Sequence, residues 1–177
     1  PALPELLTEL TARPITRILI NSNGLRIATD DHLLELLTAH RDRVEVYLQY
    51  DGQSPATHRF HRGGDLTRTK TQALQRLSES EIFTTLVMTV ALGVNDTEIG
   101  QLVQLALDTP YVGGITIQPQ FGSGRSGYID PLDRLTHTGV LKRLGPQTTG
   151  LVTWRDLTAL PCSHPHCCSV GYLIRDD

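Results

Sequence analysis

Apolar residues follow two patterns that alternate along most of the chain. One has helical spacing, with apolar residues three or four positions apart. The other is a short apolar run bounded by turn residues, which is typical of a buried strand. The helical stripes lie around residues 3–10, 33–37, 66–77 and 99–107, and the strand-like runs lie at 15–20, 44–50, 83–90 and 113–119.

This alternation predicts an α/β fold with a parallel sheet, because strands joined through helices make right-handed crossovers. The runs are apolar throughout, so we expect both faces of the sheet to be covered. The chain opens on a helix without a preceding strand, so we expect a barrel or doubly wound sheet with its first strands missing and one edge unprotected. Residues 1–150 are assigned to this sheet and residues 151–177 to an irregular tail.

Weaker signals concern the connections between these elements. Residues 51–64, which include Pro55 and two consecutive glycines, are predicted to form a polar loop. Asn95 and Glu98 have the spacing of a capping-box pair at the start of a helix. We also expect a short helix near residues 132–144 and a last short strand at residues 172–174.

Composition narrows the classes of function. The formal charge of -3 and the pI of about 6.2 do not indicate the basic charge that favours binding to nucleic acid. No apolar run approaches the roughly 18 residues of a transmembrane segment, and the acidic, amphipathic start does not resemble a signal peptide. Residue 1 is proline rather than methionine, so we expect a processed or cut product.

Polar residues follow each predicted strand at its carboxyl end, where parallel α/β sheets bind ligands. Each of them is also an ordinary turn residue, but their recurrence favours a polar ligand at this edge. An arginine before the glycine pair, Arg62, could bind a carboxylate, with a solvated basic loop as the alternative. Scattered histidines such as His58 and His61 are expected at the surface. The strand-end residues are Asn21 and Asn23, Gln49 and Asp51, Thr89 and Asn95, and Gln118.

All three cysteines lie in the tail, within the run PCSHPHCC, as Cys162, Cys167 and Cys168. An odd, clustered set of thiols predicts no disulfide framework and a reducing, cytoplasmic location. Metal binding is favoured over reduced buried thiols, because soft ligands select zinc or iron–sulfur. His164 and His166 could complete a zinc site, whereas three thiolates suit a [4Fe–4S] cluster.

Several runs, in order, resemble consecutive segments of the radical S-adenosylmethionine (SAM) superfamily. They are ILINSNGLRIA, VYLQYDG, TLVMTVALGVNDTEIGQLVQLAL and GGITIQPQFGSGR. The final run, DLTALPCSHPHCCSVGYLIR, is similar to the tail of a branch that includes tetraether-lipid synthases and pterin-methylating enzymes. The resemblance covers nearly the whole chain and implies a partial TIM-type (βα) barrel with parallel strands alternating with helices.

The family implies a [4Fe–4S] cluster bound by a CxxxCxxC motif, which chelates SAM and generates a 5′-deoxyadenosyl radical. This sequence contains neither that motif nor the GGEP-like motif that holds the SAM amino group. The resemblance places Gln49 opposite the SAM ribose or carboxylate, with Asp51 in the same turn. It places Arg62 against the SAM carboxylate and Asn21 and Asn23 beside the cofactor. The cysteine tail would hold an auxiliary cluster or close the substrate side.

We therefore expect the C-terminal portion of a radical SAM enzyme, inactive as an isolated chain. Its partners would be SAM and an unknown small-molecule or lipid-like substrate, without nucleic acid or a transmembrane segment. The alternative is a non-catalytic α/β binding module with a zinc-binding tail. An unrelated α/β small-molecule binder is a third reading, but it leaves the clustered cysteines unexplained.

Overall fold

The computed structural model describes residues 3–122, 130, 132–160, 164 and 167–174. The four long predicted strands all form, within a few residues of the expected bounds. In chain order the elements are α1 (Leu3–Thr11), β1 (Ile18–Ser22), α2 (Asp31–Ala39), β2 (Val44–Gln49), α3 (Pro55–Arg62), α4 (Thr67–Glu79), β3 (Thr84–Val90), α5 (Ile99–Asp108), β4 (Val112–Pro119), α6 (His137–Gln147), a 3-10 turn (Trp154–Asp156), β5 (Thr158–Ala159) and β6 (Ser169–Val170).

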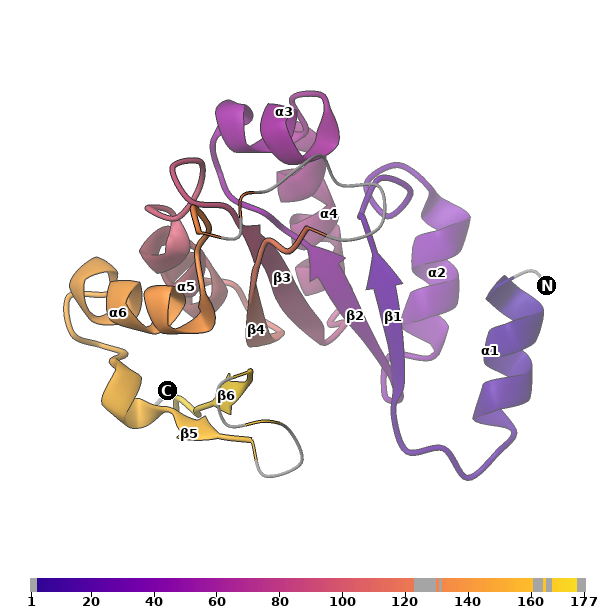
Figure 1. Ribbon diagram of the computed structural model, residues 1–177. Helices are drawn as coiled ribbons and strands as arrows, with labels where there is room; N and C mark the ends of the chain where they lie inside the picture. The colour runs from indigo at the N-terminus through magenta and orange to yellow at the C-terminus, as the bar shows by residue number, and fades with distance from the viewer. Residues whose placement is uncertain (1–2, 123–129, 131, 161–163, 165–166, 175–177) are drawn as a thin grey trace.

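The four long strands make one parallel sheet in the order β1-β2-β3-β4 (Figure 1). Neighbours in sequence are therefore neighbours in space, as in a (βα) barrel. Helices α2, α4 and α5 lie together on one face of the sheet. This arrangement is the expected α/β fold of parallel strands alternating with helices, and it is consistent with a partial TIM-type barrel.

The core lies between the sheet and these helices. Strand β2 alternates, with Val44, Val46 and Leu48 fully buried and the residues between them half-buried. The half-buried side chains of β2 are Glu45, Tyr47 and Gln49, so the second face of this strand is polar and only partly covered. The expectation of apolar strands covered on both faces is therefore wrong for β2.

Helix α5 begins where its apolar stripe predicts, and that stripe faces the core. The predicted capping box at its start is absent. Glu98 occupies the N-cap position without a side-chain cap bond, because its carboxylate binds another helix instead. Asn95 likewise bonds to distant strand ends rather than to the helix terminus.

The expected polar loop at residues 51–64 contains the short helix α3. Ser54 caps it by accepting a hydrogen bond from Thr57 N at 3.2 Å, Pro55 opens it, and Gly63 ends it in a left-handed conformation. These are standard helix boundary residues. The intervening residues carry no clear apolar stripe, which is why the periodicity did not reveal the helix.

Helix α6 overlaps the helix expected at residues 132–144, but it begins five residues later and ends three residues later. The last strand is at Ser169–Val170 rather than at 172–174, and it pairs antiparallel with Thr158–Ala159, which no pattern predicted. Residues 172–174 are instead exposed. None of the helices in the described part of the chain is long and apolar enough to cross a membrane.

Candidate ligand site at the carboxyl ends of the strands

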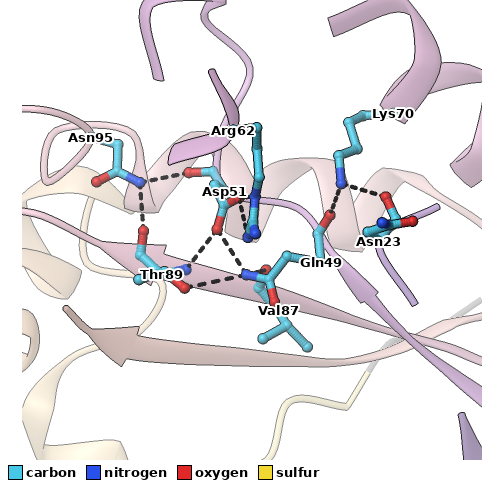
Figure 2. A network of polar contacts seen from close by, with 8 residues as sticks. All are labelled: Asn23, Gln49, Asp51, Arg62, Lys70, Val87, Thr89 and Asn95. Carbon is cyan, nitrogen blue, oxygen red and sulfur yellow. Dashed lines mark hydrogen bonds and ion pairs between the residues drawn. The ribbon is translucent and has the colours of Figure 1, made fainter. Parts of the chain in front are cut away.

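The carboxyl ends of β2 and β3 converge on the carboxylate of Asp51, which is fully buried (Figure 2). Oδ1 accepts hydrogen bonds from Gln49 Nε2 at 2.8 Å and from Thr89 N at 3.1 Å. Oδ2 accepts from Arg62 Nε at 2.8 Å and Nη2 at 2.7 Å. Asp51 therefore joins two strand ends to helix α3.

The Asp51 carboxyl group is ionised in this setting. Burial alone would raise its pKa, but the hydrogen bond from Gln49 and the positive charge of Arg62 more than offset that effect. The net result is a pKa below the ordinary aspartate value. The side chain of its partner Arg62 is 31% exposed, so this ion pair is partly open to solvent on the arginine side.

Asn95 extends the network toward helix α5. Its Nδ2 donates to the backbone oxygens of Asp51 at 2.7 Å and Thr89 at 2.8 Å, and its Oδ1 accepts from Ala91 N at 2.8 Å. The side chain is fully buried. Asn95 therefore satisfies backbone groups at both strand ends and fixes their separation.

Glu98 is a second buried carboxylate, and it accepts hydrogen bonds from residues at the N-terminal end of α3. It accepts hydrogen bonds from Gln53 N, Ser54 N, Ser54 Oγ and Thr57 Oγ1, at 2.6 to 3.2 Å. Burial would raise its pKa, but these bonds bring it below the ordinary value. A Cβ on Gly52 would overlap Glu98 Oε2, so glycine is needed for the close approach of this turn.

The end of β1 is linked to the same region through Lys70 of helix α4. Its Nζ donates to the backbone oxygens of Asn23 and Gln49, each at 2.6 Å. Asn21 and Asn23 themselves are exposed. Lys70 escaped the sequence analysis, although it lies three, four and seven positions before the buried residues Ala73, Leu74 and Leu77, and that spacing could have identified it.

Helix α3 also carries two histidines that sequence reasoning placed at the surface. That expectation is wrong for His58, which is fully buried and has no hydrogen-bond partner at either ring nitrogen among the described residues. His61 is half-buried. Burial lowers the pKa of both imidazoles, so both are neutral near pH 7.

The structure thus places Gln49 and Arg62 each in direct contact with Asp51, and Lys70 links the backbone of Gln49 to that of Asn23. The tail is different. Cys162 and His166 lie outside the described residues, Cys167 is exposed and Cys168 is half-buried. Within the part of the chain that the structure describes, no three His, Cys, Asp or Glu side chains are grouped to hold a metal ion.

The polar groups at this edge decide which ligand groups it could bind. It offers a guanidinium, amides and backbone carbonyls, which suit the carboxylate, amine and ribose of a polar ligand. The residues of this network include no cysteine, so they themselves offer no thiolate. These residues therefore fit the polar parts of SAM, but they do not fit an iron–sulfur cluster.

Comparison with models of known protein families identifies the family of this chain. The model of the radical SAM superfamily matches residues 1–106, which is more than half of the chain. This chain belongs to the radical SAM superfamily. The match runs from the first helix to helix α5 and so includes the whole Asp51 network.

A second comparison relates this radical SAM chain to a longer protein. It is 28% identical, over 177 residues, to the 7,8-dihydro-6-hydroxymethylpterin dimethyltransferase of Methanocaldococcus jannaschii. The alignment covers 98% of this chain and 35% of that protein. The chain therefore spans about a third of the length of this relative.

Proposed function

We propose that this chain supplies the later part of a radical SAM barrel, C-terminal to the segment that binds the catalytic cluster. The observation that carries the proposal is Arg62, held by the buried Asp51 and still partly exposed at the carboxyl ends of the strands. The family match and the missing CxxxCxxC motif support it. We further propose a cytoplasmic location, as the reduced, clustered thiols suggest.

The proposed SAM-binding residues are Asn21, Asn23, Gln49, Asp51 and Arg62. Arg62 would pair with the SAM carboxylate, and the exposed amides of the β1 turn would contact its polar groups. Asp51 would act through its neighbours, because its carboxylate is buried and already holds Gln49 and Arg62. When bound to a reduced cluster, SAM supplies the radical that removes hydrogen from a substrate carbon.

For the intact enzyme, we propose radical modification of carbon in a small-molecule substrate. Methylation is the first outcome to test, because the relative named above is a pterin dimethyltransferase. A separate possibility to test is a lipid-like substrate, as expected from the branch that the tail resembles. The sequence similarity over nearly the whole chain supports this choice of reaction class.

We expect the isolated chain to bind SAM without cleaving it. After anaerobic reconstitution with iron and sulfide, it should release no 5′-deoxyadenosine above a no-protein control in the presence of dithionite. Calorimetry should show SAM binding that weakens about tenfold in Arg62→Met, the cost of one charge-assisted pair at a partly exposed site.

Arg59→Met is the matched control for this experiment. Arg59 lies on the same helix, but it is exposed and only approaches Asp65 at 3.8 Å. It should leave SAM affinity unchanged. Cleavage of SAM by the isolated chain would contradict its assignment as inactive, and equal binding by both variants would contradict the role of Arg62.

For the tail, we propose an auxiliary iron–sulfur cluster on Cys162, Cys167 and Cys168, with Cys168 the least secure ligand because neighbouring residues of an extended chain point apart. The alternative, a binding module with a zinc-bearing tail, is favoured only by His164 and His166 in the same run. We expect the Cys162→Ala, Cys167→Ala double variant of the anaerobically purified protein to lose iron. Unchanged iron with a fall in zinc would favour the alternative.

A further inference from the structure

Lys70 is a buried cation at the proposed SAM site that neither the family match nor the proposal above explains. Its side chain is the largest of the fully buried ones among the described residues. Its Nζ donates to Asn23 O and Gln49 O, the backbone carbonyls at the ends of β1 and β2 (Figure 2). No carboxylate of the described residues lies within ion-pair distance of it.

Burying an ammonium group without a carboxylate partner costs stability. Burial and the nearby positive charge of Arg62 lower the pKa of Lys70 to about 8, although Asp51 acts in the opposite direction. Lys70 is therefore still mostly protonated at pH 7. A neutral residue could fill the same space, so the retained charge needs another explanation.

The charges around Lys70 suggest one. From helix α3 it faces Arg62 and His58, and from the end of β2 it faces Asp51. His58 is neutral because burial, followed by the charge of Lys70, lowers its pKa. Asp51 neutralises Arg62 through a direct pair, and this leaves the charge of Lys70 without a balancing charge among these neighbours.

We infer that Lys70 is a positioning residue that holds the ends of β1 and β2 together and biases this edge of the sheet toward a ligand carrying a carboxylate. The two backbone bonds set the distance between the Asn21–Asn23 turn and Gln49, which come from different strands. The unbalanced charge attracts an anionic group without contacting it. This inference rests on the proposed SAM site. It adds a physical reason for that site to prefer a ligand that carries a carboxylate.

The test compares SAM with decarboxylated SAM, which lacks only the carboxylate. Binding of both to the 177-residue chain is measured for the wild type, Lys70→Met and Leu77→Ala. We expect the wild type to prefer SAM, Lys70→Met to lose about tenfold of that preference, and Leu77→Ala to keep it. Leu77 is a fully buried residue of the same helix, so this variant controls for loss of packing.

The pH dependence separates the charge of Lys70 from its space-filling role. The ratio of wild-type to Lys70→Met affinity for SAM should fall between pH 7 and pH 9, as Lys70 loses its proton near pH 8. Taking the ratio cancels the titration of SAM itself. Thermal unfolding of each variant confirms that binding is measured on folded protein.

The outcomes separate this inference from the proposal on which it rests. If the wild type prefers SAM and Lys70→Met keeps the same preference, the inference is wrong and the SAM site stands. Loss of the preference in Leu77→Ala as well would assign the effect to packing and would overturn the inference. If the wild type binds neither ligand, the proposed SAM site fails and this inference fails with it.

Discussion

Replacing Asp51 with asparagine should destabilise the fold by about 3 kcal/mol, because it leaves the partners of a buried carboxylate unpaired. Arg62 would lose its counterion, and if the amide oxygen keeps Gln49 Nε2 and Thr89 N, as Oδ1 does, the new NH2 group would face the N–H donors of Arg62. The measurement is urea unfolding at pH 7. The SAM affinity of the Asp51→Asn variant should also fall, because Arg62 is no longer held in place.

The stability gained from Asp51 should also depend on pH. Its pKa is lower in the folded than in the unfolded state, so this contribution is present above the unfolded value near 4. It is lost as the pH falls through the folded value. The difference in unfolding free energy between wild type and Asp51→Asn should therefore shrink below about pH 4.

Asp31→Asn is the control for Asp51. It removes an exposed ion pair with Arg76, and pairs of this kind are worth about 1 kcal/mol or less. If both aspartate variants lose similar stability, the Asp51 network contributes no more than a surface pair.

Replacing Glu98 with glutamine should have the second largest effect, a loss of about 2 kcal/mol. Each carboxylate oxygen of Glu98 accepts two hydrogen bonds from the start of α3, and glutamine would replace one of these oxygens with an NH2 group, so two of the four donors would lose their acceptor. Helix α3 should then loosen at its N-terminus. Amide hydrogen exchange of residues 53–62 would report this directly.

Glu35→Gln is the matched control, since the Glu35 side chain is 77% exposed and approaches only His32, at 3.7 Å. It should change neither stability nor exchange. Because α3 carries Arg62, Glu98→Gln should also weaken SAM binding at temperatures where the chain remains folded. Faster exchange spread evenly over the whole chain would show global destabilisation instead of a local role.

The elements that the sequence predicted best are those whose signal is local. Strand β3 is buried over nearly its whole length, and β2 alternates buried apolar residues with half-buried ones, so each local pattern reports burial directly. Helix α3 was missed because its polar residues mask the signals of Ser54, Pro55 and Gly63. Lys70 was missed because an isolated lysine is normally solvated.

The capping-box prediction failed for a related reason. Its spacing was correct, but Asn95 and Glu98 satisfy backbone groups more than 40 residues earlier in the chain, at Asp51 and at Gln53. A buried carboxylate or amide bonds to whichever donors or acceptors the fold leaves without partners. Local spacing cannot identify those groups.

By itself, the sequence determined the order of helices and strands, the parallel sheet, the family, and the set of polar residues at the strand ends. Hydrophobic periodicity carries the order of helices and strands, because burial of one face requires a repeating pattern along the chain, whereas the family came from the resemblance of consecutive runs. Only the tertiary structure decided that Asp51 holds Arg62, that Glu98 caps α3, and that Lys70 is buried between two strand ends. Those contacts join residues 11 to 47 positions apart, and they exist only once the strands are in register.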